Sequence, residues 1–196
     1  MTATVIYLAI FAAVAYYGIT VFNALVALRN QYANAFAQID VQLQRRYELI
    51  PNLVEAAKAY LSHEKDTLSA VIAARNQAAG LEKALAGNAG NGEAMAKFAQ
   101  AEGVLNGALG RLMMVSEAYP DLKADGTVAD LMEELKSTEN RVGFARQAFN
   151  DAVMEYNIRR EQFPDNLIAG VCAFHRASPL EIPNVEAREP VRIQMT

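Results

Sequence analysis

The sequence predicts an all-α protein in which an N-terminal transmembrane helix continues into an elongated antiparallel (up-and-down) helical bundle with a short extended C-terminal arm. Three observations carry this prediction. No charged side chain precedes Arg29. The chain is 53% hydrophobic, with no Trp and only six Pro, a composition that favours helices over strands. Apolar residues recur three or four positions apart along most of the remaining length.

Residues 1–28 have the composition of a transmembrane anchor. Residues 5–26 form an uncharged stretch of about 22 residues, which as a helix crosses roughly 30 Å of hydrocarbon. We therefore expect contact with membrane lipid through residues 5–26. A buried core helix is the alternative, but core helices rarely run so long without a charge. A cleaved signal peptide would use the small residues Ala13 and Ala15, yet no basic region precedes the stretch and it continues beyond them.

The basic residues near the anchor predict its orientation. None precedes the span, whereas Arg29, Arg45 and Arg46 follow it within about 20 residues. The positive-inside rule then places the N-terminus outside and the C-terminal domain in the cytoplasm. The expected location is the cell inner membrane of a bacterium, crossed in a single pass.

Residues 29–163 are predicted to form the cytoplasmic bundle, and its first helix is the continuation of the anchor. Pro51 should kink or break this rod, because proline lacks the N–H and its ring clashes with the preceding turn. A second helical stretch from Asn52 to about Leu85 has apolar residues on more than one face, which indicates contact with more than one neighbour. The sequence GNAGNG, Gly87 to Gly92, then interrupts the chain.

The third helix, from about Glu93 to Ala118, has apolar residues spaced seven apart with a second set three positions later, as in a coiled-coil seam. It also contains Gly103, Gly107 and Gly110. A phosphate-binding loop would need a following GK[ST] and a preceding strand, and the sequence has neither. We therefore expect the glycines to permit close approach of a neighbouring helix.

The fourth helix opens at Thr127 or Asp130 and keeps a 4-3 apolar alternation for over four heptads, until Pro164 ends it. Residues 164–196 form the predicted C-terminal arm. This tail contains three further prolines, and Val191, Ile193 and Met195 alternate with polar residues as in a short strand or extended segment. The pattern leaves open whether the arm packs on its own domain or on a neighbouring copy.

A set of polar residues accompanies the apolar seams of the first and fourth helices. We hypothesise that they meet in a partly buried network of ion pairs and amides that fixes helix register, because buried polar groups are costly unless paired. The alternative is a solvated face with weak pairs four residues apart. The residues are Asp40, Arg45 and Arg46 on the first helix, and Glu139, Arg146, Asn150 and Asn157 on the fourth.

The sequence indicates no catalytic, cofactor-binding or metal-binding residue, and we expect no enzymatic activity. His63 and Glu64 are adjacent, so on a helix they point about 100° apart, and Thr67 stands where an HExxH motif needs its second histidine. Cys172 has no second cysteine with which to form a disulfide or a CxxC pair. The net charge of −4, with scattered basic residues, argues against nucleic acid as a partner.

Several segments together resemble the LemA family. They are LVALRNQYANAFAQIDVQLQRRYELIPNLVEAAKAYLSHE, LNGALGRLMMVSEAYPDLKADG and ELKSTENRVGFARQAFNDAVMEYNIRREQFPDNLIAG, which span nearly the whole chain. The resemblance implies an N-terminal membrane helix, a short exterior N-terminus and a cytoplasmic helical bundle. It supplies no enzymatic activity, cofactor or catalytic residue.

Two functions follow from these features. The first is a membrane-anchored, non-enzymatic helical scaffold that self-associates and organises partner proteins or membrane, so that a homo-oligomer and an unidentified protein partner are expected. The alternative is a monomeric adaptor that regulates a membrane enzyme through a groove on the bundle. The two differ in the mass expected after solubilisation and in the need for an exposed apolar patch on one helix face.

Overall fold

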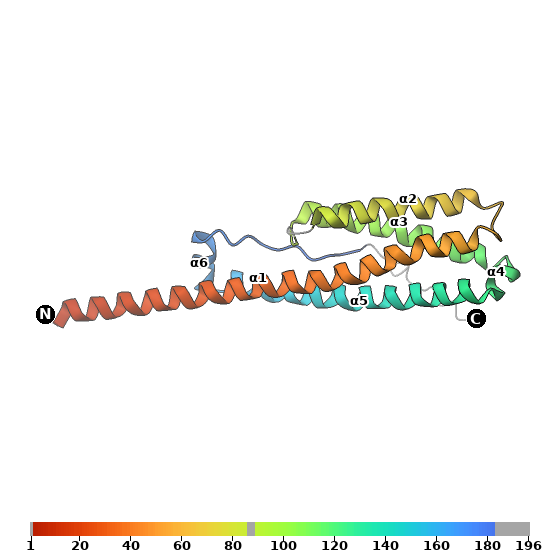
Figure 1. Ribbon diagram of the computed structural model, residues 1–196. Coiled ribbons are helices and arrows are strands. Elements are labelled where there is room, and N and C mark those ends of the chain that lie inside the picture. The colour runs from red at the N-terminus through yellow and green to blue at the C-terminus, as the bar shows by residue number, and fades with distance from the viewer. Residues whose placement is uncertain (1, 86–88, 183–196) are drawn as a thin grey trace, which may run out of the picture.

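The computed structural model describes residues 2–85 and 89–182, and this part of the chain is all-α, as the sequence predicts. α1 and α5 pack antiparallel over most of the length of α5, and α2 and α3 form a second antiparallel pair against the distal half of α1 (Figure 1). The described helices are α1 (Thr2–Ala57), α2 (Lys65–Leu85), α3 (Gly92–Ser116), α4 (Pro120–Ala124), α5 (Gly126–Glu161) and α6 (Asp165–Val171).

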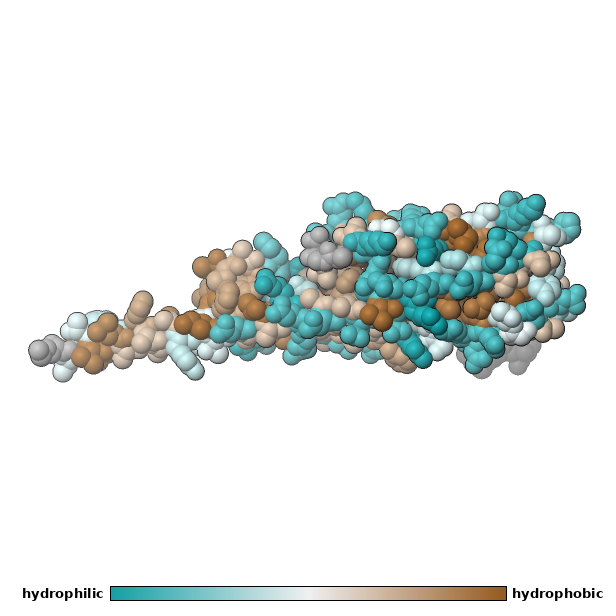
Figure 2. All heavy atoms as spheres, viewed as in Figure 1, coloured by the Kyte–Doolittle hydropathy of each residue, from teal (hydrophilic) through white to brown (hydrophobic). Residues whose placement is uncertain are grey.

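α1 is a single helix of 56 residues that contains both the apolar N-terminal stretch and the centre of the bundle. The side chains of residues 2–17 are all exposed, and the first buried side chain is that of Val21. This N-terminal part projects alone beyond the bundle, with apolar residues on its surface (Figures 1 and 2). Within the described residues, α1 is the one helix long and apolar enough to cross a membrane by length and composition. One continuous helix therefore joins the predicted anchor to the bundle.

Of the kink or break expected at Pro51, the break is wrong, because α1 continues through Pro51 to Ala57. Proline cannot donate to the carbonyl four residues earlier, which here belongs to Tyr47. Arg75 of α2 supplies the missing donor, with its Nε 3.0 Å from the Tyr47 carbonyl oxygen. The Arg75 guanidinium also lies 6.0 Å from the centre of the Tyr47 ring. A neighbouring helix thus satisfies the carbonyl that the proline leaves free, and the helix continues.

The second helical stretch is shorter than predicted. The chain leaves α1 at Ala57 and enters α2 at Lys65, so the expected helix from Asn52 to Leu85 is divided by a connection. Two residues of this connection belong to the protein interior: Leu61 is fully buried, and the Tyr60 hydroxyl donates to Asp125 Oδ2 at 2.8 Å. Tyr60 and Leu61, which were predicted to belong to the apolar face of a helix, therefore cover the end of the bundle instead.

The fourth predicted helix is α5, and it begins slightly before the expected position. Asp125 is its N-cap, with the side chain accepting a hydrogen bond from the Val128 N–H at 3.0 Å. This bond and the Tyr60 hydroxyl favour the charged carboxylate and lower the pKa of Asp125. Further along, Phe149 and Tyr156 of α5 meet aromatic rings of α1 edge to face, with Tyr32 and Tyr156 centroids 5.2 Å apart.

The glycines of α3 do not mark a close helix approach, which corrects the sequence-based expectation. A Cβ added to Gly103, Gly107 or Gly110 would meet no atom within 4 Å. Because the two α3 positions Gly107 and Gly110 are exposed and helical, nothing in the described packing requires glycine there. The space next to Gly110 is instead part of an open groove.

The C-terminal segment, predicted to be an extended arm, begins with a helix. After Pro164 the chain forms α6, which crosses α1 and returns the chain to the other side of the rod (Figure 1). Residues 174–182 then run without helix or strand along the bundle, and Phe174, Ala177 and Leu180 are buried. The predicted alternation at Val191, Ile193 and Met195 lies outside the described residues.

Candidate functional site

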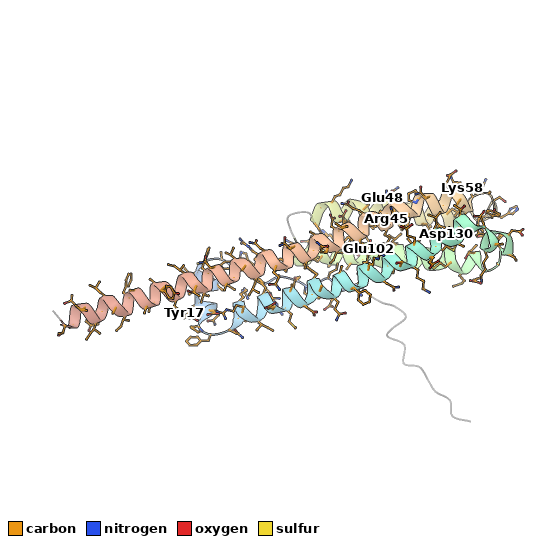
Figure 3. The ribbon with its side chains drawn as sticks, turned by 60° about the horizontal axis from the view of Figure 1, so that its bottom comes forward. Tyr17, Arg45, Glu48, Lys58, Glu102 and Asp130 are labelled. Atoms are coloured by element: carbon orange, nitrogen blue, oxygen red, sulfur yellow. The ribbon has the colours of Figure 1, made fainter. Side chains whose placement is uncertain are left out.

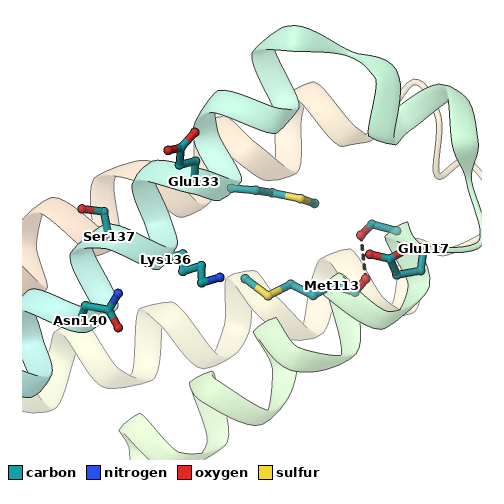
Figure 4. Close-up of a pocket in the computed structure, with 8 residues that line it drawn as sticks. Met113, Glu117, Glu133, Lys136, Ser137 and Asn140 are labelled. Atoms are coloured by element: carbon teal, nitrogen blue, oxygen red, sulfur yellow. Dashed lines mark hydrogen bonds between the residues drawn. The ribbon is translucent and has the colours of Figure 1, made fainter.

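A groove lies between α3 and α5 on the side of the bundle away from α2. Its wall near the end of α3 and the start of α5 is lined by Met113, Met132, Glu133 and Lys136, among others, and the hollow there measures about 620 Å³ (Figure 4). A second hollow of about 410 Å³ adjoins it and shares Met113 and Lys136. The groove exists because α5 packs on α1, and α3 on α2, which leaves the facing sides of α3 and α5 open.

Arg46 of α1 forms the floor of the second hollow. Its side chain is only 2% exposed, and its Nη1 lies 2.8 Å from Glu102 Oε2 of α3. Its Nη2 donates to Asn106 and lies 3.0 Å from Glu139 Oε2 of α5. The Tyr47 hydroxyl donates to the second oxygen of Glu102 at 2.6 Å. One guanidinium therefore connects the three longest bundle helices.

The electrostatics of this network are set mainly by burial. Glu102 is fully buried, and loss of water raises the pKa of its carboxyl, although the Arg46 charge and the Tyr47 hydroxyl act in the opposite direction. Burial also raises the pKa of Tyr47, followed by the effect of the Glu102 charge. Tyr47 therefore remains a protonated donor, and the Arg46–Glu102 pair is a charged interaction held away from solvent.

The structure brings some of the sequence-predicted polar residues together and separates others. Arg46 and Glu139 meet, as described above. Arg45 pairs at the surface with Glu134 of α5, and both side chains are about half exposed. Asp40 accepts from Gln44 of its own helix at 3.2 Å. Arg146 is partly buried in α5 and is not among the residues that contact Arg46. That the network fixes helix register stays a prediction.

Asn150 and Asn157 lie on α5 as predicted, but their partner is the C-terminal arm. Each side-chain amide makes two hydrogen bonds to the backbone of one arm residue. Asn157 Nδ2 donates to the Ala177 carbonyl at 2.8 Å and its Oδ1 accepts from the Ala177 N–H at 3.0 Å. Asn150 makes the same pair of bonds with Leu180, at 3.2 and 2.8 Å. Each asparagine amide thus makes the same pair of hydrogen bonds to the arm backbone that a neighbouring strand would make.

The spacing of the two asparagines matches the spacing of their partners. Seven residues of helix rise about 10.5 Å, and three residues of extended chain cover about 10 Å. Ala177 and Leu180 are three residues apart, so each meets one asparagine in register. Tyr156 adds a bond from its hydroxyl to the His175 carbonyl at 2.8 Å, and the Ser178 N–H donates to the Gly90 carbonyl at 2.9 Å. The described arm is therefore bound in cis along its length.

A comparison with known families identifies the family of this chain. The model described as the LemA family matches residues 35–195, which is most of the sequence. The chain belongs to the LemA family. The match includes all of α2 to α6 and α1 from residue 35 onwards, so it covers both the groove and the arm described above.

Curated relatives of this LemA-family chain are magnetosome proteins. Magnetosome proteins MamQ 1 and MamQ 2 of Paramagnetospirillum magneticum are each 29% identical over 175 residues, covering 80% of this chain and 63% of the relative. Magnetosome protein MamQ of Magnetospirillum gryphiswaldense is 27% identical over 174 residues, covering 79% and 62%. The LemA-family chain therefore spans less than two thirds of the length of these relatives.

Sequence reasoning missed Glu102, Asn106 and Tyr47, which complete the network of this LemA-family protein. A signal for Glu102 is present in the sequence: it lies four residues after Phe98 and three before Leu105, so the apolar face of α3 carries a carboxylate. A lone acid on such a face needs a buried cation, and Arg46 is the basic residue in the apolar pattern of α1. Pairing them across helices requires the packing order, which the sequence did not supply.

The LemA-family structure brings together no cluster suited to metal chemistry among its described residues, where no group of three or more His, Cys, Asp or Glu side chains could hold an ion. His63 lies in the connection between α1 and α2, and His175 lies in the arm. The groove and its floor are suited to binding another molecule. They combine apolar methionine and leucine side chains with the charges of Lys136, Glu133 and Glu139.

Proposed function

We propose that this LemA-family chain is a membrane-anchored, non-enzymatic helical scaffold that self-associates and organises partner proteins or membrane. The continuity of α1 is the observation that carries the proposal. Residues 2–17 have exposed apolar surface on every side, while the same helix from Val21 onwards is the central element of the bundle. A helix that crosses the bilayer therefore holds the bundle rigidly next to it, without a linker.

The proposed topology follows the distribution of arginines. α1 has no basic residue before Arg29, so the N-terminus is placed outside and the bundle in the cytoplasm, at the cell inner membrane. The names of the relatives, magnetosome proteins, specify no reaction. This is in keeping with a structural role for the chain.

Self-association is proposed to use the outer side of the α1–α5 pair. Phe144, Met154 and Ile158 of α5 are 74%, 58% and 49% exposed. At 100° per residue they fall within about 80° of each other around the helix axis, so they share one side of α5. Val41, on the facing part of α1, is 56% exposed. Large apolar side chains gathered on one side of a soluble bundle are typical of protein interfaces.

The groove between α3 and α5 supports the second part of the proposal, the binding of a partner protein. Two antiparallel helices with an open apolar channel between them can accept a further amphipathic helix, with Leu109, Met113 and Leu135 as its apolar lining and Lys136 and Glu133 at its edge. The same groove is what a monomeric adaptor for a membrane enzyme would use. Subunit number therefore separates the two functions.

Cross-linking in the membrane tests the proposed interface. In a Cys172→Ser background, which removes the single native cysteine, Met154→Cys places one thiol on the proposed contact side. Lys97→Cys is the matched control, since Lys97 is exposed on α3, on the opposite pair of helices. We expect a short bifunctional thiol reagent to give covalent dimers with Met154→Cys and not with Lys97→Cys. Single-chain bands for both variants contradict self-association through α5.

A further inference from the structure

We propose that the end of the bundle nearest the N-terminus inserts into the boundary between headgroups and acyl chains of the leaflet on its side. This end, called here the shoulder, consists of Phe163, Leu167 and Val171 at the turn from α5 into α6 and on α6 itself. The inference rests on the proposed function, because it requires α1 to cross the bilayer. It adds a second membrane-binding element within the folded domain.

The part of α1 that projects from the bundle is shorter than the hydrocarbon layer is thick. Residues 2–17 are exposed, with Tyr17 at the end of the segment in contact with α6, and they span about 24 Å at 1.5 Å per residue. Hydrocarbon is about 30 Å thick, so roughly 6 Å of membrane remains after the bare segment ends. α6 packs on α1 where the bare segment ends: Ile168 Cδ1 lies 3.7 Å from the position of a Cβ on Gly18. The missing depth falls within the 5–10 Å to which interfacial helices are buried.

The shoulder has the surface that such a position requires. Phe163, Leu167 and Val171 are 81%, 61% and 88% exposed, although each is large and apolar. The opposite side of α6 is covered, since Asp165 and Ala169 are buried against the bundle. Hydrophobic atoms stand out at the step between the bare helix and the bundle (Figure 2). α6 lies at the end of the bundle from which the bare part of α1 projects (Figure 1), so this apolar cluster adds to the exposed apolar surface of α1 at that end.

The charges behind the shoulder suit the headgroup layer. The whole chain is acidic, with a net charge of −4, yet arginines gather at this end, where Arg29 lies over the Phe174 ring and Arg160 donates to the Phe174 carbonyl. Glu161 lies 3.7 Å from one of them and 3.9 Å from another, and Asp165 neutralises a third. The remaining cationic excess attracts anionic lipid, while long side chains reach from apolar surface to phosphate. The arginines are Arg29, Arg159, Arg160 and Arg176.

A buried polar contact fixes the depth of the shoulder relative to α1. Asp165 is 3% exposed, and its Oδ1 accepts from the Tyr17 hydroxyl at 2.5 Å. Its Oδ2 lies 2.6 Å from Arg159 Nε. Tyr17 is visible at this junction in Figure 3. Since both carboxylate oxygens are held, α6 keeps a fixed height along α1, and the shoulder meets the membrane whenever α1 spans it.

Tryptophan fluorescence tests the inference, because the chain contains no Trp and each introduced Trp is a sole reporter. We compare three full-length variants in vesicles of phosphatidylcholine and phosphatidylglycerol brominated either near the headgroup or near the chain end. Val171→Trp reports the shoulder, and Val14→Trp, at a 65% exposed site, reports the bare part of α1. Met114→Trp, at a 75% exposed site at the far end of α3, is the control.

The inference predicts that Val171→Trp loses roughly half of its emission to bromine near the headgroup, and less to bromine near the chain end, as expected for interfacial depth. Val14→Trp should respond most to chain-end bromine, and Met114→Trp to neither. Quenching of Val14→Trp without quenching of Val171→Trp overturns the shoulder and leaves the anchor intact. Absence of quenching in Val14→Trp overturns both. Blue-shifted but unquenched emission from Val171→Trp shows that protein covers the shoulder, which also overturns the inference.

Discussion

Replacement of Arg46 by Met should destabilise the bundle strongly, because it leaves the Glu102 carboxylate buried without its cation. Arg46 and Glu102 are 2% and 0% exposed, and their 2.8 Å contact is the shortest link that the guanidinium makes to a fully buried group. Removing one partner of a buried ion pair costs about 3–5 kcal/mol. For a chain of this size about 2–4 °C accompanies each kcal/mol, so Tm should fall by roughly 6–20 °C.

The loss should also depend on pH, with a defined sign. Burial already raises the pKa of Glu102, and removal of Arg46 takes away the main influence that lowers it. An acid whose pKa is raised in the folded state stabilises the fold below its ordinary pKa, and this contribution is lost as pH rises through the folded pKa. The stability difference between Arg46→Met and wild type should therefore be smaller near about pH 5 than near about pH 8.

The assay is thermal unfolding of the full-length protein in mild detergent, followed by the far-ultraviolet circular dichroism of the helices. Arg45→Met is the matched control: it removes the neighbouring arginine, whose pair with Glu134 is about half exposed and therefore contributes little to stability. The reasoning is refuted if Arg46→Met lowers Tm no more than Arg45→Met does. An equal loss at acidic and alkaline pH would refute the assigned role of Glu102.

Four further changes have expected outcomes, the first three in the same unfolding assay and the fourth in amide hydrogen exchange. Gly107→Ala should raise stability by up to about 1 kcal/mol, because the site is helical and a Cβ meets nothing within 4 Å; a loss would show that the glycine is needed. Arg75→Met should lower stability by about 1–3 kcal/mol because the Tyr47 carbonyl loses its donor, and replacing Pro51 by Ala in the same chain should recover much of it. Asp125→Ala should lower stability at neutral pH, and its difference from wild type should vanish as pH falls through the lowered pKa of Asp125. Asn157→Leu should release the arm near Ala177, seen as faster amide hydrogen exchange there with little change in the helices.

The helices were predictable where the evidence for them is local. The apolar seams that predict α3 and α5 persist for several turns, and both helices appear within a few residues of the expected bounds. The break expected at Pro51 does not occur because the cost of a proline depends on whether the carbonyl it leaves free finds another donor, and that donor, Arg75, comes from a different helix. α6 was missed because seven residues carry too little periodicity to indicate a helix.

For the polar residues too, the sequence indicates their positions along a helix but not the partners that other segments of the chain supply. The stripe on α5 predicts that Glu139, Arg146, Asn150 and Asn157 meet the polar residues of α1, but of these Glu139 contacts Arg46 while the two asparagines bind other partners. Glu139 meets Arg46, whereas the asparagines bind backbone atoms of the arm. Every residue except proline carries the same backbone carbonyl and N–H groups. Hydrogen bonds from asparagine side chains to such groups therefore cannot be predicted from the pattern of side chains.

The mass of the full-length protein in mild detergent, measured by light scattering with the detergent contribution subtracted, tests the proposed scaffold most directly. One chain has a mass of 21.4 kDa. The scaffold predicts a single discrete species at a multiple of that mass, and predicts that Phe144→Arg, on the proposed contact side of α5, reduces it. A mass of one chain for the wild-type protein contradicts self-association and leaves the monomeric adaptor as the function that the groove supports.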